Sequence, residues 1–196
     1  MINAYDFDET IYDGDSSVDF YFYSLKHNKK VLLVLPKQLY GVILYKLKLI
    51  DKTKMKEHIF SFLKYIKDVD MLVNTFWNEK YKNIKKWYLD QKEESDVIIS
   101  ASPEFLLKPL EHKLKVTVIA SIVDKKTGKF LSKNCHDYEK IKRYEKIFKK
   151  KIKEFYSDSI KADYPMFLYA SKAILVKKDE LIELDKKEIE NKVLKK

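Results

Sequence analysis

Residues 4–10 read Ala-Tyr-Asp-Phe-Asp-Glu-Thr, and this run says more about the fold and the function than any other stretch. Asp6 and Asp8 are two positions apart, so in an extended chain both side chains point to one side while Phe7 points to the other. Two neighbouring carboxylates repel each other unless a cation or a shared proton relieves the repulsion. With the hydroxyl of Thr10 close by, they offer the hard oxygen ligands that suit Mg²⁺. So short a pattern also fits an exposed acidic turn after a strand.

Three later stretches favour a functional site. Residues 96–100 form a continuous apolar run that ends in the hydroxyl of Ser100, as buried parallel strands do. Lys140 follows in a basic segment, and Asp158 and Asp163 come just beyond another short apolar stretch. Since parallel sheets bind ligands at the carboxyl ends of their strands, we expect these side chains to meet at one edge of a sheet.

In this order, the four pieces resemble the haloacid dehalogenase (HAD) superfamily, specifically its phosphoserine-phosphatase-like branch (subfamily IB). The resemblance covers the first strand and most of residues 96–176. It implies an α/β fold with a Rossmann-like HAD core, a parallel sheet and an inserted all-helical cap of the C1 type. It also implies a Mg²⁺-dependent phosphatase that hydrolyses a small phosphomonoester through an aspartyl-phosphate intermediate.

Hydrophobic periodicity predicts where the core and the cap lie in the chain. Residues 13–95 read as helical and fall between two core strands, so we expect them to form the cap and residues 1–12 and 96–196 the core. Cap helices are expected at residues 18–25, 31–50 (one or two, broken near Pro36), 54–66 and 69–88. Core strands are expected at residues 2–7, 97–100, 116–121, 153–157 and 173–176, core helices at 103–113, 138–151 and 165–170, and a turn around Gly128.

The resemblance assigns the chemistry to acids that are distant in sequence. Asp6 is expected to be the nucleophile, because a carboxylate can accept a phosphoryl group and divide the hydrolysis into two steps. Asp8 is expected to act as general acid and then as general base, which needs a carboxyl group able to hold a proton near neutral pH. The expected metal ligands are Asp6, Asp8 (through its backbone carbonyl) and Asp158. Asp163 is expected to support them, although a turn that caps a helix also explains this residue.

Phosphate binding is expected at the end of the strand predicted for residues 97–100. The hydroxyl of Ser100 and the following N–H groups, at Ala101 and Ser102, would meet a phosphate at the start of a helix. Ser102 fits a helix N-cap equally well. Thr10 is grouped with these residues, and we expect it mainly to hydrogen bond within its loop.

Lys140 is the expected cation for the phosphate and for the Asp6 carboxylate. Several lysines share its predicted helix, and most of them must be solvated. The resemblance selects Lys140, because residues 134–140 (Asn-Cys-His-Asp-Tyr-Glu-Lys) look like the Asn-Cys-x-Gly-x-x-Lys of this branch. Asp137 replaces the usual glycine, and some phosphoserine phosphatases carry the lysine one turn earlier, where this chain has His136.

Asp15 corresponds, counting from the nucleophile, to an acidic cap-entry residue that meets the substrate amine in phosphoserine phosphatases. An ordinary helix N-cap explains Asp15 as well. The arginine that those enzymes use for the substrate carboxylate has no match in the cap, where Lys56 and His58 lie near that place. The expected partner is therefore a small phosphorylated metabolite that the sequence does not name.

The composition is that of a lysine-rich globular chain of 196 residues with a net charge of +10. Arg143 is the single arginine, and base readout favours arginine, so no nucleic-acid partner is expected. Two alternatives stay open: a phosphotransferase on the same core and, less favoured, a non-catalytic protein that binds nucleic acid or a membrane surface.

Cys135 is the one cysteine, which excludes an internal disulfide and fits a reducing cytoplasmic location. No signal peptide is visible. Residues 31–50 are the most apolar stretch, but Pro36 and three lysines interrupt it, so no transmembrane segment is expected. Contact of this stretch with a membrane surface is the minority interpretation. The sequence leaves the oligomeric state open.

Overall fold

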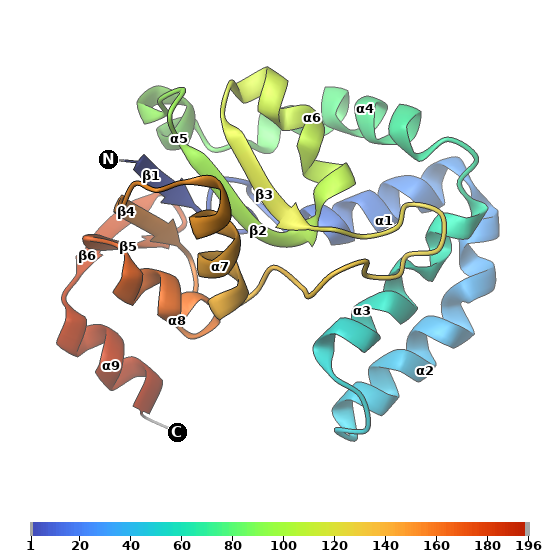
Figure 1. Cartoon of the computed structure of the whole chain (residues 1–196). Coiled ribbons are helices and arrows are strands. Elements are labelled where there is room, and N and C mark those ends of the chain that lie inside the picture. Colours follow the sequence, from blue (N-terminus) through green and yellow to red (C-terminus); the bar gives the residue numbers. More distant parts are fainter. Residues whose placement is uncertain (1, 195–196) are drawn as a thin grey trace.

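Six strands form the sheet at the centre of the computed structural model, which describes residues 2–194 (Figure 1). They are β1 (Ile2–Tyr5), β2 (Val97–Pro103), β3 (Thr117–Ser121), β4 (Ile152–Ser157), β5 (Lys172–Lys177) and β6 (Glu180–Leu184). Their spatial order is β3-β2-β1-β4-β5-β6, so the first strand of the chain lies inside the sheet. β1 to β5 pair in parallel, and β6 pairs antiparallel with β5 at one edge.

Helices connect these strands, as parallel pairing requires. The α-helices are α1 (Ser16–His27), α2 (Leu35–Lys46), α3 (Lys52–Phe60), α4 (Val69–Lys80), α5 (Lys86–Gln91), α6 (Glu104–Leu114), α7 (Tyr138–Ile147), α8 (Ile160–Tyr169) and α9 (Lys186–Leu194). Three 3₁₀ segments, η1 (Lys29–Val34), η2 (Ser61–Tyr65) and η3 (Tyr81–Asn83), lie between helices of the segment that separates β1 from β2.

Strand β2 is buried on both faces, because its alternate side chains enter different hydrophobic layers. Ile98 packs in the layer that includes side chains of α4, α5 and α6. Val97 and Ile99 pack in the layer that includes side chains of α7, α8 and α9. Helices cover both faces of the sheet, so the side chains on both faces of β2 are buried. This explains the continuous apolar run that predicted a buried parallel strand.

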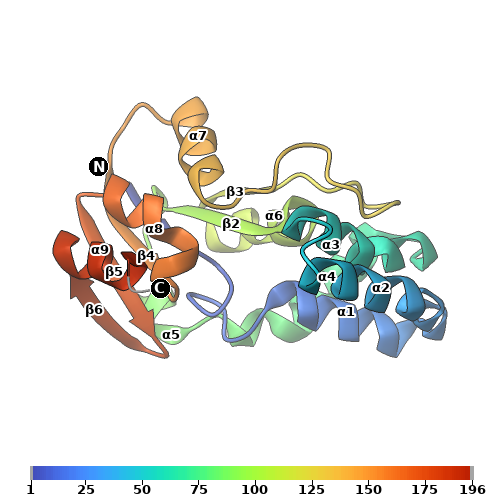
Figure 2. The same ribbon diagram turned by 90° about the horizontal axis from the view of Figure 1, so that it is seen from below.

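Helices α1 to α4 form a lobe beyond one end of the sheet (Figures 1 and 2). Within it, α2 and α3 approach so closely that a Cβ on Gly41 would lie 2.4 Å from the Cβ of His58. The core of the lobe is aromatic, and the buried rings of Phe76 and Trp77 lie 4.8 Å apart. Trp77 also meets the ring of Phe7 edge-on at 5.9 Å. The loop after β1 is therefore packed into the lobe.

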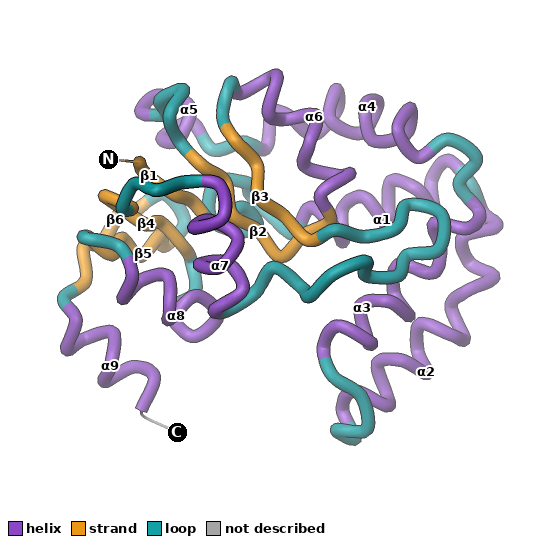
Figure 3. The backbone as a smooth tube through the Cα atoms, viewed as in Figure 1, coloured by secondary structure: helices purple, strands orange, loops and turns teal. Residues whose placement is uncertain are grey.

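A hairpin in the long connection between β3 and α7 joins the sheet to the lobe (Figure 3). Val123 pairs with Phe130 across the hairpin, which confirms the predicted turn around Gly128. The N–H of Phe130 donates to Oε1 of Glu57 in α3 at 3.0 Å. Gly128 has a φ of +75°, and a Cβ there would lie 2.4 Å from the carbonyl oxygen of Phe60. The turn therefore rests directly on the backbone at the end of α3.

Several core boundaries differ from the predicted ones. β1 ends at Tyr5, because the chain turns away from the sheet after it. β2 continues to Pro103, which ends the strand and lies at the N-cap of α6 instead of in its first turn. α8 begins at Ile160 rather than at Pro165, and its backbone departs from helical geometry at Asp163. A proline inside a helix lacks the N–H for one hydrogen bond, which explains the kink beside it.

Three of the predicted lobe helices are shorter in the structure, α1 is longer than the helix predicted at 18–25, and the sheet has one more strand than predicted. The helical stretch predicted at 31–50 divides into η1 and α2, with Pro36 in the first turn of α2. The stretches predicted at 54–66 and 69–88 are each interrupted by a 3₁₀ segment. The antiparallel β6 has no counterpart among the predicted strands and adds an antiparallel edge to the predicted parallel sheet. Two of the five residues in its sequence, Glu-Leu-Ile-Glu-Leu, are charged, and the strand is mostly exposed, as an edge strand allows.

Gly128→Ala is expected to lower the free energy of unfolding by about 1–3 kcal/mol, because the new Cβ meets the Phe60 carbonyl in a backbone region that favours glycine. Urea unfolding should show a lower midpoint with an unchanged slope. Lys126→Ala, an exposed change in the same turn, is the control and should stay within about 0.5 kcal/mol of the wild type. Equal stability of the Gly128→Ala and wild-type proteins would contradict the close approach.

Candidate active site

The candidate active site lies at the carboxyl ends of β2, β1 and β4, which are adjacent in the sheet. The chain leaves β1 at Asp6, whose N–H donates to the Tyr156 carbonyl of β4 at 2.8 Å. Ser100 lies in the second half of β2, and Ser157 ends β4. Parallel strands end at the same edge of a sheet, so residues that are distant in sequence converge here.

Lys140 binds two carboxylates at once inside the protein. Its Nζ lies 2.6 Å from Oδ1 of Asp6 and 2.6 Å from Oδ1 of Asp163. The side chains of Lys140 and Asp163 are each only 2% exposed, and Ser157 Oγ donates to the second oxygen of Asp163 at 2.7 Å. Lys140 lies in the first turn of α7, which Asp137 precedes at the N-cap with a φ of +56°, at the position where the resemblance expects glycine. A buried ammonium group needs such paired charges.

Asp8 accepts hydrogen bonds from two separate elements. Ser102 Oγ donates to its Oδ2 at 2.5 Å, and the N–H of Ser16, the first residue of α1, donates to its Oδ1 at 2.6 Å. A helix N-terminus favours negative charge at this place. The N–H of Ser102 donates to Ser100 Oγ at 3.0 Å. Ser102 is therefore a partner of Asp8 within β2, and the alternative that it caps α6 is wrong, because Pro103 holds that position.

Thr10 joins Asp158 to the loop after β1. The N–H of Asp158 donates to Thr10 Oγ1 at 2.9 Å, and this hydroxyl lies 3.4 Å from Oδ1 of Asp158. Thr10 is fully buried, whereas Asp158 is exposed. Within residues 2–194, no hydrogen bond connects Asp158 directly to Asp6 or Asp8. The Thr10 hydroxyl therefore connects Asp158 to the loop that carries Asp6 and Asp8.

Asp15 lies at the N-cap of α1. Its Oδ1 accepts hydrogen bonds from the N–H groups of Ser17 at 2.9 Å and Val18 at 3.0 Å. These contacts are those of an ordinary helix cap, which is one of the two explanations that the sequence allows. The side chain of Ser17 also reaches the site, because its Oγ lies 3.1 Å from Ser102 Oγ.

Lys56 of α3 brings a second cation to the site from the lobe. Its Nζ donates to the carbonyl of Ala101 at 3.0 Å. Burial and the neighbouring charge of Lys52 lower the pKa of Lys56 to about 8, against the opposing attraction of the site carboxylates. No catalytic or binding role was predicted for Lys56 from the sequence. Its only sequence signal is its place near the arginine expected from phosphoserine phosphatases.

Burial changes the protonation of the acids in the site. It raises the pKa of Asp6 to about 8, although the attraction of Lys140 opposes the change. Burial, together with repulsion from Asp15, also raises the pKa of Asp8 above its usual range, against the hydrogen bonds that Asp8 accepts. Burial alone would lower the pKa of Lys140, but attraction to its two carboxylate partners outweighs it and raises that pKa. The shift at Asp8 is in the direction that a general acid requires, because it favours the protonated carboxyl group.

The acid cluster fits a Mg²⁺ ion that has few protein ligands. Asp6 is repelled by the charges of both Asp163 and Asp8, and the single ammonium group of Lys140 contacts only Asp6 and Asp163, so a divalent cation would relieve the remaining repulsion. In the part of the chain that the structure describes, no three His, Cys, Asp or Glu side chains form a ready metal cage. The predicted set needs only the carboxylates of Asp6 and Asp158 and one backbone carbonyl, because Mg²⁺ usually keeps several waters.

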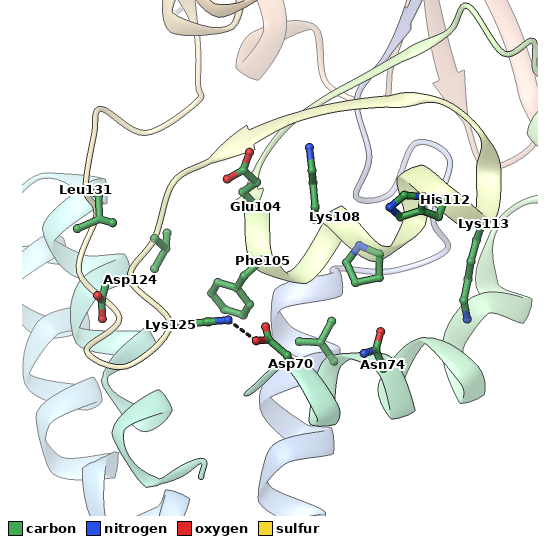
Figure 4. A pocket seen from close by; sticks show the side chains of 13 residues that line it. Asp70, Asn74, Glu104, Phe105, Lys108, His112, Lys113, Asp124, Lys125 and Leu131 are labelled. Atoms are coloured by element: carbon green, nitrogen blue, oxygen red, sulfur yellow. Dashed lines mark hydrogen bonds and ion pairs between the residues drawn. The ribbon is translucent and has the colours of Figure 1, made fainter. Parts of the chain in front are cut away.

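A separate cavity of about 780 Å³ lies between α4, α6 and the β3–α7 hairpin. Figure 4 shows Asp70 and Lys125 paired across it, with Phe105 and His112 on its α6 side. None of the acids that gather around Lys140 lines this cavity. The cavity is therefore distinct from the candidate active site.

Residues 4–168 match a family model that is described as haloacid dehalogenase-like hydrolase. The match covers most of the chain, so this protein belongs to the haloacid dehalogenase-like hydrolase family. The order of the four motifs predicted this family correctly. The α/β fold with a mostly parallel sheet, predicted from the same residues, is also confirmed.

Two solved structures share this fold. A protein with unknown function from Bordetella pertussis Tohama I has a TM-score of 0.70 and 14% sequence identity over 89% of each chain. A phosphoserine phosphohydrolase-like protein from Francisella tularensis subsp. tularensis SCHU S4 has a TM-score of 0.53 and 16% identity, over 91% of this chain and 88% of that one. No curated protein matches this chain. Identities this low establish a common fold and leave the substrate to be inferred from the site.

The raised pKa of Asp6 predicts that the Mg²⁺-free protein loses stability as the pH rises from about 4 to about 8. The folded protein keeps a proton up to a pKa of about 8, whereas the ordinary value is 3.8. The stabilising contribution of this group is therefore complete below about pH 4 and is lost as the pH rises through the folded value. Urea unfolding at several pH values should show the decline, and Asp6→Asn should reduce it. Identical pH profiles for the two proteins would contradict this assignment.

Proposed function

We propose that this protein is a Mg²⁺-dependent phosphatase that hydrolyses a small phosphomonoester through an aspartyl-phosphate on Asp6. The observation that supports the proposal is that different groups bind the two acids that follow β1, Asp6 and Asp8. Lys140 binds the carboxylate of Asp6, while Ser102 and the N-terminus of α1 bind that of Asp8. A nucleophilic carboxylate and a proton-holding carboxyl group, two positions apart, can act on the same phosphoryl group.

In the first step, the ionised carboxylate form of Asp6 attacks the phosphorus atom. Lys140 binds Oδ1 of Asp6, so we assign the attack to Oδ2. The bond from Oδ2 to phosphorus forms while the bond from phosphorus to the alcohol oxygen breaks, and Asp8 gives its proton to that leaving oxygen. Burial raises the pKa of Asp8, which is the direction that suits it to carry this proton.

In the second step, the ionised Asp8 takes a proton from water. The water oxygen attacks phosphorus, the bond to Asp6 breaks, and inorganic phosphate leaves with both acids restored. Between the two steps, hydrogen bonds of 2.5 Å from Ser102 Oγ and 2.6 Å from the Ser16 N–H stabilise the ionised Asp8.

The phosphate oxygens are assigned to the end of β2 and to the lobe. The Ser102 N–H orients Ser100, whose hydroxyl and the N–H of Ala101 would bind the phosphate, while Lys56 supplies positive charge from the lobe. Asp6, Asp158 and the carbonyl of Asp8 would hold Mg²⁺, which would neutralise charge on the phosphate oxygens.

We also propose that residues 13–95 act as a cap on a core formed by residues 1–12 and 96–196. Lys56 reaches the site from this segment, and closure of the lobe would exclude bulk water during the reaction. At the end of the segment, α5 packs on the sheet, where the ring of Tyr88 lies 4.9 Å from that of Tyr5. The moving part would therefore be α1 to α4.

Asp6→Asn is expected to lower kcat by roughly a thousandfold or more, because an amide cannot accept the phosphoryl group. The assay measures phosphate release from a panel of small phosphate esters, with Mg²⁺ and with a chelator. Asp90→Asn, which changes an exposed acid of α5, is the control and should keep wild-type turnover. Turnover that survives Asp6→Asn would refute the nucleophile. Transfer to an added alcohol in place of phosphate release would identify a phosphotransferase.

Lys56→Gln is expected to raise KM by roughly tenfold and to change kcat less, because Lys56 binds the phosphate in both the ground state and the transition state. Steady-state kinetics on the best ester of the panel would measure both constants. Lys67→Gln, an exposed lysine of the same lobe, is the matched control and should leave both unchanged. A fall in kcat alone would instead place Lys56 among the groups that act only in the transition state.

A further inference from the structure

An apolar groove of about 470 Å³ lies in the lobe between α1, α2 and α3. Phe22 of α1 and Leu35 and Leu39 of α2 are among its lining side chains. Ser17 and Lys56 line it as well, and both contact β2 at the candidate active site, through Ser102 Oγ at 3.1 Å and the Ala101 carbonyl at 3.0 Å. The groove therefore begins beside the phosphate position and extends into the lobe.

Leu35 and Leu39 line the groove and are also exposed, so the groove continues into an exposed apolar surface formed by α2 and the residues that flank it. Helix α2 lies at the outer edge of the lobe (Figures 1 and 2). We call this surface the α2 face, and it consists of Leu33, Leu35, Leu39, Ile43, Leu47 and Leu49. These side chains are 42–67% exposed. Of the seventeen exposed large hydrophobic side chains in the described part of the chain, eleven lie within residues 18–49. Such a concentration marks an interaction surface rather than scattered exposure.

Positive charge surrounds the α2 face. Residues 29–54 contain seven lysines, all exposed, and one acid, Asp51. Tyr40 and Tyr45 are also exposed on α2, and tyrosine favours the boundary between water and lipid. Apolar side chains among lysines are the pattern of a helix that lies in the surface of an anionic membrane. No helix within residues 2–194 has the length and the apolar character needed to cross a bilayer, so the contact would be at the surface.

We propose that the substrate is the phosphomonoester of a lipid, which the protein takes from an anionic membrane surface that its α2 face contacts. This inference rests on the proposed function. The phosphate would lie at Asp6 and Lys56, and the hydrocarbon chain would follow the groove past Phe22 and Leu39 to the α2 face. A polar metabolite would leave this apolar groove without a complementary ligand.

Charge argues against other occupants of the α2 face. A second copy of this chain would bring two lysine-rich surfaces together, and like charges across an interface are unfavourable. Nucleic acid would gain little from exposed leucine and isoleucine side chains, and Arg143 lies on α7, outside the lobe. An anionic bilayer offers both the apolar interior and the negative surface that this face complements.

The first test measures kcat/KM for soluble alkyl phosphates of increasing chain length. We expect kcat/KM to rise roughly fourfold for each added methylene until the groove is full, the equivalent of about 0.8 kcal/mol per buried methylene. Leu39→Asp, at a side chain that is 55% exposed and so tolerates the change, should abolish the rise. Met71→Asp, on the equally exposed surface of α4, is the control and should retain it. Hydrolysis that is independent of chain length overturns the inference but keeps the phosphatase, whereas no hydrolysis of any ester contradicts the proposed function itself.

The second test measures binding without turnover. Asp6→Asn protein is mixed with vesicles of phosphatidylcholine alone or with added phosphatidylserine, and the bound fraction is measured by co-sedimentation. We expect binding to the anionic vesicles only, with roughly fivefold weaker binding for each lysine removed in Lys46→Gln and Lys48→Gln. Lys146→Gln and Lys149→Gln, at exposed positions outside the lobe, should bind as before. No binding to anionic vesicles, or a concentration-dependent dimer that Leu39→Asp disrupts, would overturn the proposal.

Discussion

The buried ammonium group of Lys140 is the constraint on which the rest of the site depends. A charge that is 2% exposed is stable only when opposite charges surround it, and here Asp6 and Asp163 do so at 2.6 Å each. Ser157 fixes the second oxygen of Asp163, and the backbone of α8 leaves helical geometry at Asp163. One interaction therefore locks together the end of β1, the start of α7 and the region where β4 leads into α8. It also leaves the Asp6 carboxylate with one oxygen bound to a cation and one oxygen that Lys140 does not bind.

The second constraint is that groups of the lobe take part in the hydrogen bonding of the site. The N–H of Ser16, the first residue of α1, binds Asp8, so the first lobe helix begins at a carboxylate of the candidate active site. Lys56 of α3 binds the Ala101 carbonyl, and the β3–α7 hairpin holds α3 through Glu57. A displacement of the lobe would therefore change the hydrogen bonding of Asp8 and the position of a cation together. Under the proposed mechanism, this coupling would link closure of the lobe to the protonation of Asp8.

Local patterns explain why much of the fold could be predicted. An apolar run such as residues 97–99, or helical periodicity such as that of residues 69–80, is a property of a few neighbouring residues, so the alternation of strands and helices is visible without coordinates. β6 escaped prediction because its glutamates lie on the exposed edge of the sheet, where the pattern of a buried strand does not apply. The contact of Ser102 with Asp8 was not predicted, because the sequence does not show that the strand continues to Pro103. Pairing with β3 is what extends the strand to that residue.

The sequence by itself determined the family, the mostly parallel α/β core and the acids and lysine that could carry the chemistry, because each depends on residue type and short spacing. The tertiary structure alone decided how those groups meet. Lys140 and Asp6 are 134 positions apart and Ser102 and Asp8 are 94 apart, and no local pattern encodes such a contact. The pKa values likewise follow from burial, which only the assembled layers produce. Composition showed that residues 31–50 are apolar, but packing decided that part of this stretch borders a groove at the active site and part stays exposed among lysines.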